Sequence, residues 1–265
     1  MGAAASSIEP LAALEGEAHL WIVRTESLAD PERRASLRRL LSEDEHARLA
    51  RRVRESDRHT FLIARALVRT VLAHYTGEAP AELRFETGRF GRPSLAFPCV
   101  DALRFSLTHT EGLVACLVGR GGEFGIDAEA LDRRGDFERI AGRVLADSEC
   151  RAWSALPEAE RRAGFLRHWT LKEAYLKALG VGLQVAPRSA VFAIDGERIR
   201  LETAAPHDSA PESWRFVGLR PTAEHTLAVA LRRIGAPSPT LVVREGMPEL
   251  PNAAATARRA ARRAG

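Results

Sequence analysis

Two long segments of the chain carry apolar residues at the spacing of an amphipathic helix. In residues 31–76 the apolar positions that share one helical face are Phe61, Ala64, Val68, Val71 and Leu72. In residues 158–179 they are Leu171, Ala174, Tyr175, Ala178 and Leu179. Because positions three and four apart lie on the same side of a helix, each segment predicts helical structure that buries one face.

Short apolar runs surround both helical segments and predict β-strands. Around the first segment these runs are residues 18–24, 83–86, 104–108 and 113–118. Around the second they are residues 123–129, 190–194, 198–202, 214–219 and 226–231, and two shorter helical patterns cover residues 136–142 and 147–155. The order strand, helices, strands therefore occurs twice. It predicts an α+β fold with two similar halves, residues 18–119 and 120–234, packed against each other.

The end of the chain has a different composition from the two predicted halves. After Ile234 the sequence becomes rich in proline and closes on the basic stretch ATARRAARRAG, with no periodic apolar face. Such a composition cannot bury enough apolar surface to order itself. We therefore predict that residues 235–265 form a disordered basic tail, and that removing residues 236–265 leaves activity intact.

Net charge narrows the choice of partner without deciding it. The 265-residue chain has a formal net charge of +4 and a pI of about 9.4, which favours an anionic partner such as nucleic acid, an acidic protein or a phosphate-rich metabolite. No apolar run is long enough to cross a membrane. The three cysteines have no Cys-x-x-Cys spacing, which argues against a zinc site or a disulfide framework and predicts a cytoplasmic location.

The positive charges are distributed unusually. The chain has 39 basic residues, and the only lysines among them are Lys172 and Lys177, close together in the second helical segment. An ammonium is compact and can lose its proton, whereas a guanidinium cannot. The pair therefore suggests a place that needs an ammonium, with chance clustering as the alternative.

The segment Gly125-Ile126-Asp127-Ala128-Glu129 places two carboxylates on one strand. Alternate residues of a strand point the same way, so Asp127 and Glu129 share one side and the apolar residues face the other. Two adjacent carboxylates repel each other unless they share a cation, and Mg²⁺ is the cation that such oxygen ligands suit. The alternative is a pair of solvated acids near a strand end.

In the second helical segment Trp169, Glu173 and Lys177 recur every four residues, opposite the apolar stripe. A glutamate and a lysine at this spacing commonly form a surface salt bridge. The tryptophan on the same face suggests that the face also packs against the other half or against a ligand. Lys172 is expected on a different face, and Gly180 closes the helix.

Two further places could hold phosphate. Thr108 and His109 follow a predicted strand and can donate hydrogen bonds, although a histidine there is more often part of a turn. Arg89 and Arg92 lie on a loop with several glycines and could hold an anion between them, although a solvated loop is equally consistent.

Taken in order, these motifs resemble those of one family. Gly91-Arg92-Pro93, the segment from Phe105 to His109, the segment from Gly125 to Glu129, and the segment from Trp169 to Leu183 are similar to the motifs of the 4′-phosphopantetheinyl transferases of the larger, surfactin-synthetase-activating type. The resemblance covers roughly residues 18–232. It implies two similar α+β halves about a pseudo-twofold axis, with an active-site cleft and coenzyme A between them.

The resemblance also implies roles for individual residues. Those that it places on Mg²⁺ are Asp127, Glu129 and Glu173. Those that it places beside coenzyme A are Arg48, Arg89, Arg92, Thr108, His109 and Lys177. Glu173, directly or through a water molecule, would accept a proton, and Lys177 would neutralise charge near the pyrophosphate. Arg92 departs from the usual lysine, Thr108 from a common serine, and Glu45 stands where some relatives have a basic residue.

The reaction that the resemblance implies is attack by a serine hydroxyl of an apo carrier protein (acyl, polyketide or peptidyl) on the β-phosphate of coenzyme A, with release of 3′,5′-ADP. It predicts a Mg²⁺-dependent monomer that needs neither nucleic acid nor a membrane. Two alternatives are a nucleic-acid-binding protein that uses the arginines and the tail, and a metal-dependent phosphohydrolase. The first does not account for the paired acids or the lysines, and the second shares the carboxylates but needs no protein-docking surface.

Overall fold

The computed structural model describes residues 11–206 and 208–248. The first half of the chain begins with one strand and three helices and continues with four strands. Its elements are β1 (Glu17–Arg24), α1 (Pro31–Arg38), α2 (Glu43–Ala50), α3 (Glu55–Thr76), β2 (Arg84–Thr87), β3 (Pro93–Phe97), β4 (Leu103–Thr110) and β5 (Leu113–Arg120).

The second half repeats this order. Its elements are β6 (Glu123–Ala130), α4 (Phe137–Val144), α5 (Asp147–Ser154), α6 (Glu158–Leu179), β7 (Val191–Asp195), β8 (Arg198–Thr203), β9 (Trp214–Thr222) and β10 (His225–Arg232). The predicted α+β fold is confirmed. Strand β3 was missed from the sequence, because it lies in a segment whose glycines and prolines predicted only a loop.

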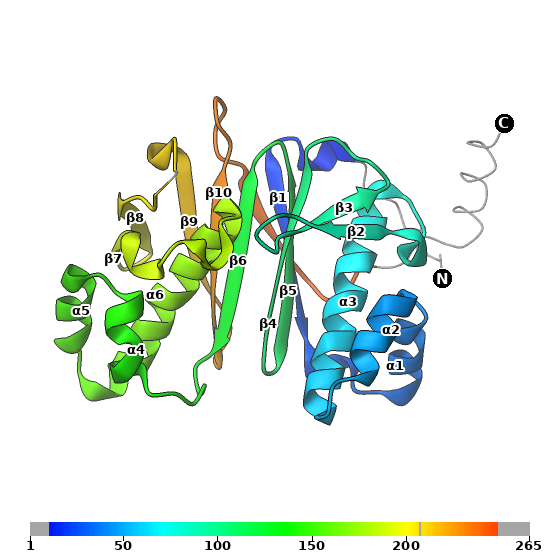
Figure 1. Cartoon of the computed structure of the whole chain (residues 1–265), viewed down its shortest axis with the longest axis horizontal. Coiled ribbons are helices and arrows are strands. Elements are labelled where there is room, and N and C mark those ends of the chain that lie inside the picture. Colours follow the sequence, from blue (N-terminus) through cyan, green and yellow to red (C-terminus); the bar gives the residue numbers. More distant parts are fainter. Residues whose placement is uncertain (1–10, 207, 249–265) are drawn as a thin grey trace, which may run out of the picture.

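Two sheets lie back to back in the middle of the molecule, and the helices cover their outer faces (Figure 1). The strand orders β1-β5-β4 and β6-β10-β9 are equivalent in the two halves. Apolar side chains between the sheets form a shared core. Its buried members are Ala18, Leu20, Ile22, Leu113, Ala115, Leu117, Phe124, Ile126, Ala128, Leu227, Val229 and Leu231.

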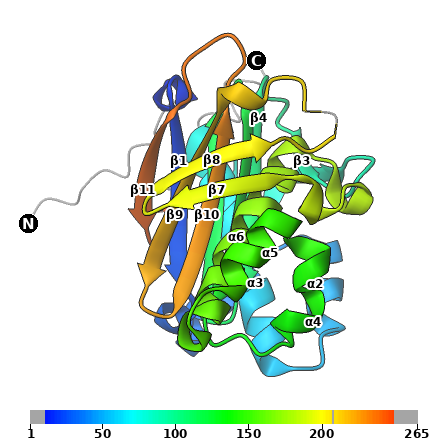
Figure 2. The ribbon, with the colours of Figure 1, turned by 90° about the vertical axis from the view of Figure 1, so that its left-hand side faces the viewer.

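The hairpin β7–β8 forms a separate two-stranded sheet. Strands β7 and β8 pair with each other and cross in front of β9 and β10, above α6 (Figure 2). Phe192 of β7 packs with Tyr175 of α6 and Phe216 of β9 in one apolar cluster. The hairpin therefore helps to hold α6 against its sheet.

Side-chain hydroxyls, rather than a backbone ladder, join the two halves where β4 lies beside β6. Ser106, Thr108 and Thr110 of β4 accept hydrogen bonds from the amides of Ile126, Ala128 and Ala130, at 3.3, 3.2 and 3.1 Å respectively. These hydroxyls satisfy the edge of β6, whose amides would otherwise be buried without acceptors.

Residues 31–76, which the pattern predicted to be helical throughout, contain three separate helices. Side-chain hydrogen bonds cap the starts of α1 and α2. The side chain of Asp30 accepts a hydrogen bond from the first turn of α1. Ser42 and Glu45 form reciprocal hydrogen bonds at the start of α2. Helices α3 and α6 both end at a left-handed glycine, Gly77 with φ 73° and Gly180 with φ 69°.

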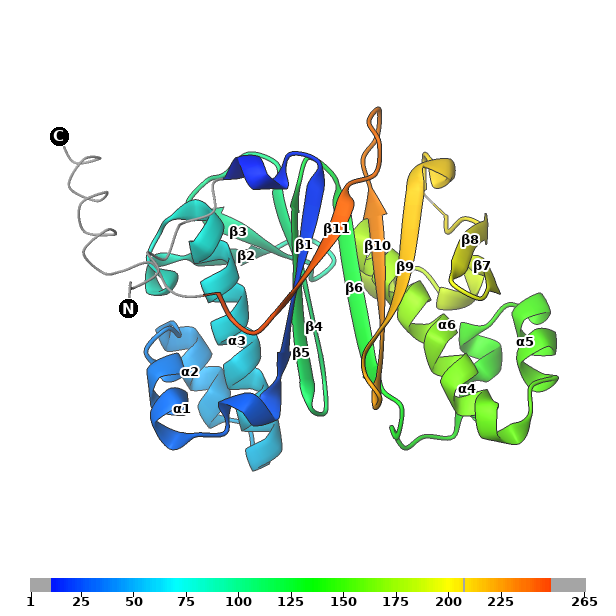
Figure 3. The ribbon, with the colours of Figure 1, turned by 180° about the vertical axis from the view of Figure 1, so that it is seen from behind.

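The prediction of a disordered tail is wrong for residues 240–245. They form strand β11 (Thr240–Glu245), which pairs in parallel with β1 and extends the first sheet (Figure 3). The exposed edge of β1 provides the backbone partners that make this short sequence a strand. Residues 249–265 of the predicted tail lie outside the described residues. No helix in the described part of the chain is long and apolar enough to span a membrane.

Candidate active site

Gly125 brings helix α6 into direct contact with strand β6. A Cβ atom at Gly125 would lie 1.9 Å from the carbonyl oxygen of Ala174 and 2.6 Å from the amide nitrogen of Ala178. Only glycine allows the two backbones to come so close. As a result, Nζ of Lys177 on the helix lies 3.2 Å from the carbonyl oxygen of Ile126 on the strand.

Asp127 lies at the centre of this contact. Its Oδ1 accepts hydrogen bonds from Nζ of Lys177 at 2.6 Å and from Oγ1 of Thr108 at 3.2 Å. Its Oδ2 is buried and has no hydrogen-bond partner. Burial raises the pKa of Asp127, and the ammonium of Lys177 opposes this rise. A buried carboxylate oxygen without a partner is costly, so this atom suits a cation that the protein itself does not supply.

Two more carboxylates border Asp127. Burial, and then the charge of Asp127, raises the pKa of Glu129 to about 7, although the paired guanidinium of Arg133 opposes the rise. Burial and the charge of Asp127 also raise the pKa of Glu173 on α6. The charge of Asp127 therefore acts on both glutamates, and negative charge is concentrated where β6 meets α6.

These side chains fit a Mg²⁺ site in which the protein supplies only some of the ligands. Within the described residues, no three carboxylate, imidazole or thiolate groups converge closely enough to enclose a metal ion as placed. Mg²⁺ usually takes one or two protein carboxylates and completes its shell with water and substrate phosphates. The unpartnered Oδ2 of Asp127 and the adjoining Glu129 and Glu173 meet that requirement.

The described ring contacts of Trp169 lie within its own half, and its contact with a ligand stays a prediction. Its ring lies beside Phe165, with centroids 6.0 Å apart, and the guanidinium of Arg133 lies 5.5 Å from its centroid. Because Arg133 also pairs with Glu129, the tryptophan supports one of the three acids.

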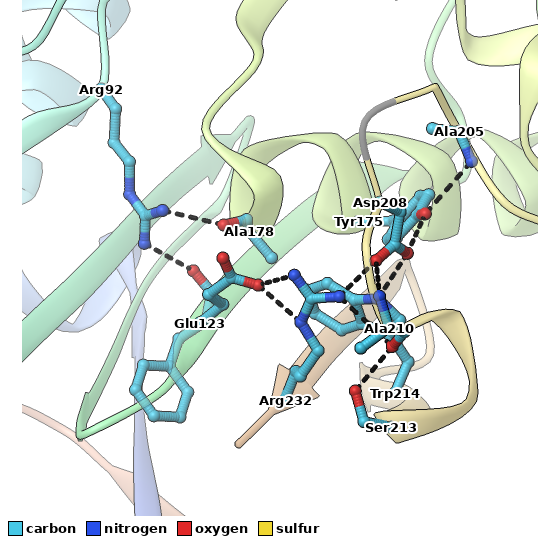
Figure 4. Close-up of polar contacts among 11 residues, drawn as sticks. Arg92, Glu123, Tyr175, Ala178, Ala205, Asp208, Ala210, Ser213, Trp214 and Arg232 are labelled. Carbon is cyan, nitrogen blue, oxygen red and sulfur yellow. Dashed lines mark hydrogen bonds and ion pairs between the residues drawn. The ribbon is translucent and has the colours of Figure 1, made fainter. Parts of the chain in front are cut away.

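A polar cluster that includes Tyr175 of α6 supports this helix (Figure 4). The hydroxyl of Tyr175 on α6 donates to Oδ2 of Asp208 at 2.5 Å, and Nε1 of Trp214 donates to the same oxygen at 2.8 Å. Arg232 pairs with Asp208, and its Nε donates to Oε2 of Glu123 at 2.6 Å. The cluster ties α6 to the start of β6 and to the segment before β9.

His109 borders a cavity of about 260 Å³ at the beginning of helix α3, together with Arg52, Arg54 and Thr110. Burial, and then the charge of Lys177, lowers the pKa of His109, and Arg52 and Arg65 act in the same direction. Positive charge from Lys177, Arg52 and Arg65 therefore acts on the histidine, while the acidic residues Asp57 and Glu111 also line the cavity. Sequence reasoning missed Arg52 and Arg54, although the basic run Arg51-Arg52-Val53-Arg54 was a visible signal.

The remaining predicted phosphate ligands lie in different surroundings. Arg48 is exposed on α2. Burial lowers the pKa of Arg65, and the charge of Arg48 acts in the same direction. Arg89 is exposed and lies over the ring of Phe90, 5.4 Å from its centroid. Thr108 has one hydroxyl proton, which goes to Asp127, while the oxygen accepts from the amide of Ala128. As placed, Thr108 supports an acid and has no proton for a phosphate.

Glu45 and Arg92, two of the three positions that depart from the family pattern, both make contacts within the protein. Glu45 is buried and pairs with Arg69 at 2.7 Å. Arg92 donates to the carbonyl oxygens of Ala178 at 2.8 Å and Phe124 at 3.4 Å (Figure 4). Both sets of contacts depend on residues far apart in the sequence.

Known proteins resemble this chain over most of its length. A family model described as the 4′-phosphopantetheinyl transferase superfamily matches residues 123–230. The 4′-phosphopantetheinyl transferase HetI of Nostoc is 32% identical over 227 residues, which cover 85% of this chain and 92% of that protein. A putative 4′-phosphopantetheinyl transferase of Synechocystis, slr0495, is 31% identical over 168 residues, 62% of this chain and 65% of that one.

A crystal structure of holo-[acyl-carrier-protein] synthase from Thermotoga maritima covers 42% of this chain and 62% of its own, with 24% identity and a TM-score of 0.35. The extended match to HetI and the family model agree with the motifs found in the sequence. The chain belongs to the 4′-phosphopantetheinyl transferase superfamily and is an enzyme of that type.

Proposed function

We propose that this enzyme transfers the 4′-phosphopantetheine group of coenzyme A to a serine of an apo carrier protein in a Mg²⁺-dependent reaction. The observation that carries the metal assignment is the buried, unpartnered Oδ2 of Asp127, beside Glu129 and Glu173. When bound, Mg²⁺ would neutralise pyrophosphate charge and polarise the phosphorus. Asp127, Glu129 and Glu173 would hold it.

Glu173 is the candidate for accepting the proton of the attacking serine. Burial and the charge of Asp127 raise its pKa toward the range in which a carboxylate works as a general base. The bond from the serine oxygen to the β-phosphorus forms while the bond from that phosphorus to the bridging oxygen breaks. The electron pair leaves with 3′,5′-ADP, and the serine proton goes to Glu173 or to a water that Glu173 holds.

Lys177 would offset the negative charge that develops on the bridging oxygen. It already lies among the acids, because its Nζ is 2.6 Å from Asp127. We assign the phosphates of coenzyme A to the basic side chains of the first half, with His109 and Arg48 as the leading candidates and Arg52 beside them in the same region. Arg89, which lies over the ring of Phe90, and Thr108, whose hydroxyl proton goes to Asp127, are the weaker candidates for the phosphates.

The partner would be an acidic carrier protein, since the enzyme has a net charge of +4 and complementary charge speeds association. We propose that the enzyme acts as a monomer, with both halves of the chain contributing residues to the site. The use of coenzyme A agrees with the cytoplasmic location that the cysteine content predicts.

The test is to incubate the protein with coenzyme A, Mg²⁺ and an apo carrier protein and to weigh the carrier by mass spectrometry. We expect the mass to rise by one phosphopantetheine group and 3′,5′-ADP to appear in equal amount. A carrier whose serine is replaced by alanine, and a reaction with chelator, serve as controls. Release of 3′,5′-ADP without carrier loading would favour a phosphohydrolase instead and would overturn the proposal.

A further inference from the structure

Arg92 reaches from the β2–β3 loop of the first half to two main-chain carbonyls of the second. Nη1 donates to the oxygen of Ala178 at 2.8 Å and Nη2 to the oxygen of Phe124 at 3.4 Å (Figure 4). Ala178 lies in the last turn of α6, where carbonyls have no partner within the helix. A cation is favourable at that end of a helix. These two hydrogen bonds are called the Arg92 bridge below.

The rest of the loop packs against the turn that follows α6. At Gly182, with φ +56°, a Cβ atom would lie 2.8 Å from the carbonyl oxygen of Phe90, and at Gly180, with φ +69°, it would lie 3.4 Å from Cδ of Arg92. Both glycines therefore leave room for the loop of the other half. An added Cβ atom at Gly182 would therefore have to displace the loop.

The two carbonyls of the Arg92 bridge belong to the elements that carry the acids. Ala178 follows Lys177 directly, and Phe124 precedes Gly125, the residue at which α6 touches β6. Burial lowers the pKa of Arg92, as expected for a guanidinium enclosed by protein. Its position fixes the ends of β6 and α6 relative to each other, at the place where the spacing between Asp127 and Lys177 is set.

We propose that Arg92 is a positioning residue that holds α6 against β6, and that it does not bind a phosphate of coenzyme A. This inference rests on the proposed function, and it replaces the phosphate contact that the sequence predicted for Arg92. A phosphate ligand contributes to the affinity for the nucleotide. A positioning residue contributes to turnover, because the reacting groups move out of alignment when it is removed.

The test compares Arg92→Met with the wild type in carrier loading and in binding of 3′,5′-ADP by titration calorimetry. We expect kcat to fall about tenfold or more, while Kd for 3′,5′-ADP changes by less than about threefold. Arg92→Lys can donate to Ala178 but cannot span both carbonyls, so its kcat should lie between the two. A Kd raised about tenfold or more, the effect of losing a charged contact, or an unchanged kcat would overturn the proposal.

A glycine pair provides the matched control. Gly182→Ala disturbs the same contact from the opposite side, since its Cβ would meet the carbonyl of Phe90. Gly196 has a nearly identical φ of +55° and no atom within 4 Å of an added Cβ, so Gly196→Ala carries the backbone strain alone. We expect Gly182→Ala to reproduce the low kcat and unchanged Kd of Arg92→Met, and Gly196→Ala to load carrier like the wild type. Equal kcat values for the two alanine variants would contradict the inference.

Unfolding measurements separate this inference from the proposed function. If the wild type neither binds 3′,5′-ADP nor loads a carrier, the proposed function fails. The Arg92 bridge still predicts that Arg92→Met and Gly182→Ala together destabilise the fold less than the sum of the single variants, since both break one contact. Additive destabilisation would show that Arg92 and the Gly182 turn act independently, against the proposal.

Discussion

The two halves of the molecule share a backbone plan and differ in what their side chains do with it. Strands β1 and β6 each have 8 residues, and helices α3 and α6 each have 22 residues. Positions in one half can therefore be matched with positions in the other. In both halves the fifth residue of the strand contacts the twentieth residue of the helix.

That matched pair shows the difference most directly. In the first half it is Trp21 and His74, whose rings contact edge to face with centroids 5.6 Å apart. In the second half it is Asp127 and Lys177, an ion pair at 2.6 Å. Matched positions thus hold a contact between aromatic rings in one half and an ion pair in the other.

The third strand residue explains how the second half accommodates charge. In the first half it is His19, a buried ring whose Nδ1 lies 2.6 Å from the hydroxyl of Tyr75. In the second half it is Gly125, which allows the backbone of α6 to touch β6. Removal of one side chain at this position brings the helix and its polar groups to the strand.

A second matched pair is the same in both halves and identifies an architectural feature. Arg69 and Lys172 are each the fifteenth residue of their helix, and each pairs at 2.7 Å with a buried glutamate, Glu45 or Glu149. Each also donates to main-chain oxygens of the segment after its helix. Lys172 therefore belongs to the framework, and the sequence-based suggestion that both lysines serve one chemical need does not hold for it.

We expect the largest effect on carrier loading from a substitution in the Asp127–Lys177 pair, compared with a substitution in the matched Trp21–His74 pair. Asp127→Asn should lower carrier loading by about 100- to 1,000-fold with little change in melting temperature, because it keeps the shape and removes the charge. Trp21→Phe, at the matched position, should lower the melting temperature and leave loading per folded molecule unchanged. Loading of the Asp127→Asn variant within a few-fold of wild type would remove the distinction between the halves.

The next effect concerns the other member of the pair. Lys177→Arg keeps the charge, but the larger planar guanidinium must displace its neighbours, and a shift of ~1 Å near the reacting atoms can cost on the order of a hundredfold. We expect a strong loss of kcat at saturating Mg²⁺ with unchanged thermal stability. His74→Gln is the matched control and should retain kcat. Wild-type turnover of Lys177→Arg would make Lys177 an ordinary surface residue.

The framework pairs should respond in the opposite way. Lys172→Arg and Arg69→Lys change a fully enclosed cation, so each should lower the free energy of unfolding by about 1–3 kcal/mol. Loading per folded molecule should stay near wild type in both. Denaturant unfolding, together with loading rates corrected for the folded fraction, measures this. A loss of kcat in Lys172→Arg alone would place Lys172 in the site after all.

Strand β11 is the one described strand that breaks the correspondence between the sheets. Truncation after residue 235 removes it and exposes the edge of β1, and we expect the melting temperature to fall by about 5 °C or more. This replaces the earlier expectation that the whole tail is dispensable. Truncation after residue 248 keeps β11 and should leave stability and loading unchanged. Equal melting temperatures for the two truncations would show that the first sheet is as complete with three strands as the second.

The smallest expected effect is a difference in how stability depends on pH. It concerns Glu129, the seventh residue of β6, which corresponds to Val23 in β1. The pKa of Glu129 is raised from 4.5 to about 7, so between these values the folded protein holds a proton that the unfolded chain releases. Its contribution to stability is therefore present at low pH and is lost as pH rises toward 7. Relative to Glu129→Gln, the metal-free wild type should lose stability across this range. Parallel stability curves for the two proteins would contradict the raised pKa.

Local pattern predicted much of the fold, because it depends on neighbours in sequence. The apolar faces of α3 and α6 and the alternation in β6 follow from 3.6- and 2-residue periods, and the structure places Ile126 and Ala128 in the shared core as expected. Strands β3 and β11 were missed for one reason. Each is a short edge element whose sequence forms a strand only when a partner, β2 or β1, is available.

The sequence by itself determined which side chains share a face: Asp127 with Glu129 on a strand, and Glu173 with Lys177 on a helix, since these relations need only local geometry. The tertiary structure decided what each of them contacts. It directed the proton of Thr108 to Asp127, the guanidinium of Arg92 to the ends of α6 and β6, and Glu45 to Arg69. A side chain's partner is set by the packing of distant segments, and that packing is a property of the whole chain.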